Sequence, residues 1–163
     1  VKLLQPFNCK ILANDILDFN DFYQENGVTP VGLEELIQKS DIVTLHLPLN
    51  SSTHNIISRE RLQMLKKDAV IINLARGGLL DEVALKEILI EKKISGAALD
   101  VFDVEPSNAQ EFALIDNVLV TPHIGGSTEE AILAMGRAAI DGLDDSKDPL
   151  NFLSSNDDKN NTV

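Results

Sequence analysis

The sequence predicts an α/β protein built on a doubly wound parallel sheet. Two observations support this prediction. Short runs such as DIVTLHL (41–47) and AVIINL (69–74) are apolar almost continuously, as in strands that are covered on both faces. These runs alternate along the chain with segments of helical spacing, and such alternation is typical of a parallel sheet.

The expected elements follow one another along the chain. We expect strands at 10–15, 41–47, 69–74, 96–102 and 117–121, and helices at 33–39, 58–65 and 82–93. Asp81 is a candidate N-cap for the helix that follows it. A last helix is expected to open at Ser127, where Ser127 to Glu130 has the form of a capping box.

The composition argues against two classes of partner. The net charge is −12, and a surface this acidic repels phosphate backbones and anionic lipids, so we expect neither nucleic acid nor membrane as a partner. The single cysteine, Cys9, cannot form an internal disulfide and is expected to be a small core residue. With no visible secretory signal, these features predict a cytoplasmic protein.

In doubly wound folds, ligands bind at the carboxyl ends of the strands. Asp15 ends the first predicted strand, where an acid can hydrogen-bond the ribose hydroxyls of a dinucleotide. Residues 16–18 offer no cation for the extra phosphate of NADP, which favours NAD. An acid in this position also commonly caps a turn, so Asp15 alone leaves both interpretations open.

Other polar residues follow later strands. Arg76 precedes Gly77-Gly78, and a guanidinium on such a turn can present a fork to a carboxylate, although a solvated arginine has the same pattern. His123 follows a strand directly and histidine is the usual proton donor or acceptor near neutral pH. Glu105 by itself reads as a surface acid, whereas Asp100 lies in a buried strand and needs partners.

Three stretches occur in an order that resembles the D-isomer-specific 2-hydroxyacid dehydrogenase family. They are NLARGGLLDE (73–82), GAALDVFDVEP (96–106) and VTPHIGGSTEEA (120–131). The resemblance implies a Rossmann-type NAD-binding domain. We expect a partial domain of this kind at 1–153 and a disordered polar tail at 154–163.

The resemblance also implies roles for individual residues in catalysis. Arg76 is expected to bind the carboxylate of the 2-oxo or 2-hydroxy acid, and His123 to be the catalytic histidine. Glu105 is expected to pair with that histidine and to stabilise the imidazolium that forms when it takes a proton.

A second set of residues is implied to hold the NAD cofactor, and no metal is expected. Asp15 is expected to bind the ribose and Asp100 to contact the nicotinamide carboxamide. The further cofactor-binding positions are Pro48, Ala75, His123 and Gly125.

The family's G-x-G-x-x-G loop does not occur in these 163 residues. The strand that feeds it is expected to be absent too, and we expect it to belong between the strands at 10–15 and 69–74. We therefore expect an incomplete sheet, and a chain that is inactive by itself because the amides of that loop bind the cofactor's pyrophosphate.

The substrate is less well defined than the family. The stretch GGSTEEA after the histidine is most similar to phosphoglycerate dehydrogenases, which favours oxidation of 3-phosphoglycerate to phosphohydroxypyruvate in serine biosynthesis. A glyoxylate or hydroxypyruvate reductase stays open, as do a non-catalytic NAD-sensing protein of the corepressor type and a non-functional gene fragment. The resemblance also implies a homo-oligomer.

Overall fold

The computed structural model describes residues 1–144, which fall into two compact units: Val1–His123 and a second unit that begins at Ile124. The first unit contains a 3-10 helix η1 (Lys2–Phe7), β1 (Ile11–Ala13), α1 (Asn20–Asn26), β2 (Val28–Pro30), α2 (Leu33–Lys39), β3 (Ile42–Leu45), α3 (Arg59–Leu62), β4 (Val70–Asn73), α4 (Glu82–Ile90), β5 (Gly96–Leu99), α5 (Ser107–Phe112) and β6 (Val118–Val120). The described part of the second unit contains α6 (Glu129–Asp144). The expected tail at 154–163 lies outside the described residues.

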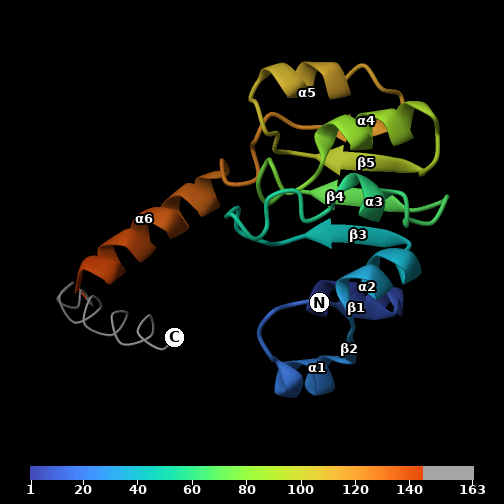
Figure 1. Cartoon of the computed structure of the whole chain (residues 1–163). Coiled ribbons are helices and arrows are strands. Elements are labelled where there is room, and N and C mark those ends of the chain that lie inside the picture. Colours follow the sequence, from blue (N-terminus) through green and yellow to red (C-terminus); the bar gives the residue numbers. More distant parts are fainter. Residues whose placement is uncertain (145–163) are drawn as a thin grey trace, which may run out of the picture. The chain divides into compact units, whose positions relative to one another are not determined.

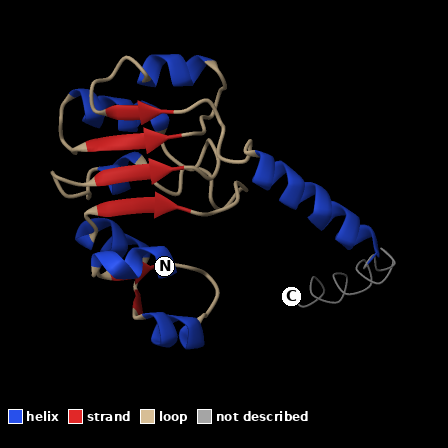
Figure 2. Cartoon of the chain, turned by 180° about the vertical axis from the view of Figure 1, so that it is seen from behind, coloured by secondary structure: helices blue, strands red, loops and turns tan. Residues whose placement is uncertain are grey.

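The strands form two parallel sheets in the first unit (Figure 2). Strands β3, β4, β5 and β6 pair in that order, with Val43 opposite Ile71 and Ile71 opposite Ala97. Strands β1 and β2 pair with each other in a separate two-stranded sheet. All pairings are parallel, so the predicted α/β class with a parallel sheet is confirmed.

One face of the four-stranded sheet carries the core. Helices α3 and α4 lie on that face (Figures 1 and 2), because consecutive right-handed crossovers in one direction place their helices on one side. The core includes Ile71, Leu85 and Leu89. On the alternate face Ile42 is 62% and Leu119 66% exposed, so the expectation that the strands are covered on both faces is not met within this unit.

The expected place of the absent strand was wrong. Strand β4 pairs with β3 on one side and with β5 on the other, so the strand predicted at 69–74 has no open edge. The edge strands of this sheet are β3 and β6, so the strand at 69–74 cannot neighbour the absent one.

Local structure departs from three further expectations. Cys9 is exposed rather than in the core, because no residue of η1 is buried and β1 begins only at Ile11. The last helix is capped by Thr128, whose hydroxyl accepts from the Ala131 N–H at 3.1 Å, and not by Ser127. Elements α1, β2 and α5 carried no sequence signal that we recognised. No helix among residues 1–144 is long and apolar enough to cross a membrane.

Candidate functional site

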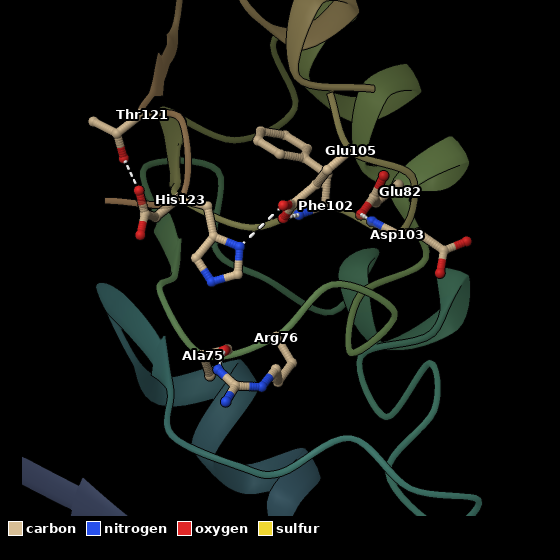
Figure 3. Close-up of polar contacts among 9 residues, drawn as sticks. Ala75, Arg76, Glu82, Phe102, Asp103, Glu105, Thr121 and His123 are labelled. Carbon is tan, nitrogen blue, oxygen red and sulfur yellow. Dashed lines mark hydrogen bonds and ion pairs between the residues drawn. The ribbon is translucent and has the colours of Figure 1, made fainter. Parts of the chain in front are cut away.

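The carboxyl ends of β4, β5 and β6 bring three of the predicted side chains to one edge of the four-stranded sheet. Arg76 follows β4, Glu105 lies in the loop after β5, and His123 lies three residues after β6. Figure 3 shows the His123 ring between Glu105 and Arg76. The structure therefore groups the predicted catalytic residues, which are distant in sequence.

His123 and Glu105 form a hydrogen-bonded pair. Nδ1 of His123 lies 3.0 Å from Oε2 of Glu105, and the Phe102 N–H donates to Oε1 of the same carboxylate at 3.0 Å. The hydrogen bond from His123, and then that from Phe102, holds the pKa of Glu105 below its ordinary value, so it is a carboxylate at neutral pH.

This pairing determines which ring nitrogen faces outward. Because a carboxylate only accepts hydrogen bonds, Nδ1 of His123 carries the proton and Nε2 keeps its lone pair in the neutral ring. In Figure 3 that second nitrogen is turned away from Glu105, toward the side on which Arg76 is drawn. The backbone of His123 has φ 55°, in the left-handed region that non-glycine residues enter rarely and often at functional sites.

Arg76 presents its guanidinium at the surface of the same edge. Its Nη1 donates to the Ala75 carbonyl at 2.6 Å. None of the ion pairs formed by the described residues includes Arg76. The remaining guanidinium donors are therefore available for a carboxylate, the ligand that their planar fork fits best.

Asn73, which sequence reasoning missed, holds the turn that carries Arg76. It is 2% exposed, its Nδ2 donates to the Arg76 carbonyl at 2.8 Å and its Oδ1 accepts from the Ala75 N–H at 3.1 Å. A buried amide is retained only where its hydrogen bonds are made. The signal that could have identified it is an asparagine at the end of the apolar run AVIIN.

Gly77 ties the same turn to the Glu105 loop. A Cβ at Gly77 would lie 2.0 Å from the Phe102 carbonyl oxygen and 2.6 Å from the Asp103 nitrogen. Only glycine permits so close an approach of two backbones. The backbones that carry Arg76 and Glu105 are therefore packed directly against each other.

Asp100 directly follows β5 and is buried, with 3% exposure. Its carboxylate accepts a hydrogen bond from the Thr121 hydroxyl, and Thr121 is a second residue that sequence reasoning did not select. The predicted requirement that Asp100 have polar partners is confirmed, whereas its contact with the nicotinamide stays a prediction.

Asp15 lies apart from these residues, beside the two-stranded sheet. It lines a cavity of about 240 Å³ together with Leu17, Asp18, Tyr23 and Val31. Oδ1 of Asp15 accepts from the Leu17 N–H at 2.9 Å, so the turn-capping interpretation holds. Neither lysine nor arginine lines the cavity, and the two acids there disfavour an additional phosphate.

The remaining predicted cofactor-binding positions are Pro48, Ala75 and Gly125. Pro48 is exposed and its carbonyl accepts from the Thr53 hydroxyl at 2.7 Å, and Ala75 is half-buried beside Arg76. Gly125 belongs to the second unit. The roles of all three stay predictions. Within residues 1–144, no group of three or more His, Cys, Asp or Glu side chains could hold a metal ion.

Comparison with known proteins extends these observations. Residues 1–125 match the family model for the D-isomer specific 2-hydroxyacid dehydrogenase NAD-binding domain. The chain is 45% identical over 137 residues to a D-3-phosphoglycerate dehydrogenase of Methanocaldococcus jannaschii, which covers 83% of the chain and 26% of the relative. It is 42% identical over 137 residues to a glyoxylate reductase of Pyrococcus furiosus, covering 84% of the chain and 41% of the relative.

Solved structures agree. The chain superposes with a TM-score of 0.80 and 30% identity on a D-isomer specific 2-hydroxyacid dehydrogenase of Lactobacillus delbrueckii in an NAD-complexed form, covering 91% of the chain and 50% of that structure. A protein of Pyrococcus horikoshii gives a TM-score of 0.81 with 34% identity, covering 87% and 43%. The chain thus spans half or less of the length of these relatives.

A parallel α/β sheet with these side chains at its carboxyl edge is the architecture of a dinucleotide-binding domain. The chain belongs to the D-isomer-specific 2-hydroxyacid dehydrogenase family and carries part of its NAD-binding domain. NAD is the cofactor for which that domain is named.

Proposed function

We propose that the whole protein is an NAD-dependent dehydrogenase that interconverts a D-2-hydroxy acid and the corresponding 2-oxo acid. The observation that carries this proposal is the pairing of His123 with Glu105 at 3.0 Å on the same strand edge as Arg76. This arrangement supplies a proton acceptor, a group that stabilises its charged form, and a carboxylate-binding cation.

Each side chain has a defined task in this proposal. In oxidation, Nε2 of His123 accepts the hydroxyl proton of the acid, and Glu105 stabilises the resulting imidazolium. Arg76 binds the carboxylate of the acid and so orients the carbon that carries the hydroxyl. In reduction His123 returns the proton to the carbonyl oxygen.

The described residues fit NAD. The cavity beside Asp15 has acids that can accept from ribose hydroxyls and no cation for a further phosphate, and Asp100 directly follows the strand that leads to the Glu105 loop. When bound, NAD takes up the hydride that leaves the substrate carbon. The protein's residues bind and orient both molecules.

For the substrate we favour 3-phosphoglycerate, which would be oxidised to phosphohydroxypyruvate. Support comes from the stretch GGSTEEA after His123 and from the similarity to the M. jannaschii enzyme. The similarity to glyoxylate reductases, and to a hydroxypyruvate reductase of Thermotoga maritima at 45% identity over 116 residues, supports those reductase activities as alternatives.

The test is steady-state NADH oxidation by the whole protein with phosphohydroxypyruvate, hydroxypyruvate, glyoxylate and pyruvate, beside the variants His123→Ala and Arg76→Ala. Turnover with one acid that is lost in both variants supports the proposal and identifies the substrate. Folded protein that binds NADH but turns over no acid would contradict it and favour a non-catalytic NAD-sensing protein.

Two further properties are proposed on the resemblance and composition. We propose a homo-oligomer, which sedimentation velocity of the whole protein tests. The cytoplasmic location is likewise a proposal, and cell fractionation tests it.

A further inference from the structure

The carboxylate of Glu82, on helix α4, accepts hydrogen bonds from both sides of the loop that carries Glu105. This loop joins β5 to α5, and Glu82 approaches it from the first turn of α4 (Figure 3). The Asp103 N–H donates to Oε1 of Glu82 at 2.6 Å, and Nδ2 of Asn108 donates to Oε2 at 2.7 Å. Asp103 and Asn108 flank Glu105 on its two sides, so a single side chain bridges the loop.

We propose that Glu82 is a positioning residue, whose carboxylate clamps this loop and so determines where Glu105 meets the ring of His123. The inference rests on the proposed function of the His123–Glu105 pair. Glu82 acts on Glu105 through the backbone of the loop and also through the repulsion between the two carboxylates, so the test must separate position from charge.

Glu82 is well suited to this task because the first turn of α4, which carries it, is anchored by a cap and by the core. It is the first residue of α4, directly after Asp81, whose side chain caps the helix by accepting from the Ala84 N–H at 2.9 Å. Ala84 and Leu85 are buried in the core. A half-buried carboxylate anchored in this way can hold two donors in fixed directions, since each oxygen accepts separately.

The clamp works together with the Gly77 contact. Glu82 holds the loop through Asp103, while the backbone at Gly77 packs against the peptide between Phe102 and Asp103. Loss of the Glu82 carboxylate leaves the Gly77 contact in place but removes the hydrogen bonds from Asp103 and Asn108. We therefore expect the loop to loosen around Glu105 rather than to detach.

The electrostatics of the loop provide a readout that is independent of turnover. Glu105 faces His123 and the Phe102 N–H, which lower its pKa, and Asp100, which raises it. If the loop loosens, the two hydrogen bonds weaken and the pKa of Glu105 returns toward its ordinary value. Burial, the largest influence, raises the pKa of Glu82 itself, and the bonds from Asn108 and Asp103 oppose that rise.

The experiment compares Glu82→Ala with Glu87→Ala in the whole protein. Glu87 is a matched control on the same helix, because its carboxylate forms an ion pair with Arg59 at the surface and also feels the charge of Lys93. The titration of the Glu105 carboxyl is followed by carbon-13 NMR, and kcat and KM are measured with the acid that gives turnover. Glu82→Gln, which keeps one oxygen for the Asp103 N–H, is the conservative variant.

Both Glu82→Ala and Glu82→Gln remove the charge of Glu82, so we expect the pKa of Glu105 to be higher in Glu82→Ala than in Glu82→Gln. We expect kcat to fall by roughly 10- to 100-fold in Glu82→Ala, since a misplacement of about 1 Å has effects of that order. The KM for NAD stays unchanged, kcat of Glu82→Gln is intermediate, and Glu87→Ala matches the wild type. The same Glu105 titration in Glu82→Ala as in Glu82→Gln, or an unchanged kcat in Glu82→Gln if the alanine variant does not fold, overturns the inference. Absence of turnover in the wild type, with a higher Glu105 pKa in Glu82→Ala than in Glu82→Gln, contradicts the proposed function and still supports the clamp.

Discussion

The two candidate ligand-binding regions of the first unit are built in different ways. At the edge that holds Arg76, Glu105 and His123, a buried asparagine, a glycine contact and a clamping carboxylate hold the backbone. At the cavity beside Asp15, the carboxylate caps its own turn and the next residue, Ile16, is 100% exposed.

The two regions differ in the secondary structure and core that stabilise them. The first region rests on a four-stranded sheet and a continuous core. The second rests on two strands of three residues each, and a two-stranded sheet is of marginal stability by itself. The proposed proton-transfer pair therefore has a well-supported scaffold within the described residues, whereas the Asp15 cavity has a weaker one.

Removal of the imidazole has the largest expected effect on the first region. His123→Ala should lower kcat by about 10²- to 10⁴-fold, the usual contribution of a general base. The KM for NAD should change little. Stopped-flow measurement of NADH formation checks this, and a loss of less than about tenfold would contradict the assignment of His123.

A methyl group at Gly77 tests the backbone contact between the two turns. Gly77→Ala places a Cβ 2.0 Å from the Phe102 carbonyl oxygen, so the free energy of unfolding should fall by about 1–3 kcal/mol. Gly32→Ala is the control, because a Cβ there meets nothing within 4 Å. Urea unfolding of both variants measures the difference, and equal stabilities would show that the contact is dispensable.

Asp15→Ala tests the second region. Loss of a charged acceptor for the ribose hydroxyls should weaken NAD binding about tenfold, since a hydrogen bond to a charged group contributes about 1.5 kcal/mol. Discrimination against NADP should fall as well. Calorimetric titration with NAD and NADP measures both affinities. If their ratio is the same in the variant and the wild type, Asp15 contributes only the hydrogen bond that caps its turn.

The smallest expected effect is on the pH dependence of stability. Because the pKa of Glu105 is lowered in the folded state, its contribution is present above the ordinary value of 4.5 and is lost as pH falls through the lowered value. Glu105→Gln should therefore make unfolding less sensitive to pH below 4.5. Urea unfolding between pH 3 and about 7 checks the sign, and a steeper acid loss in the variant would refute it.

Much of the site could be predicted from the sequence. The strand ends located Arg76 and His123, and the three ordered motifs added Glu105 to them. Asn73 was not recognised although an asparagine at the end of an apolar run could have identified it, and Glu82 was not recognised because an acid in a helical turn has no distinctive local pattern. Their partners became visible only in the structure, and for Glu82 these are Asp103 and Asn108, 21 and 26 residues away.

The sequence by itself determined the alternation of strands and helices, the parallel sheet and the family, because burial periodicity and ordered motifs are local properties of the chain. Only the tertiary structure decided that β3, and not β4, lies at an edge of the sheet, that Nδ1 of His123 faces Glu105, and that one carboxylate bridges the Glu105 loop. These features depend on strand order and on how loops from different crossovers meet, and no local pattern specifies either.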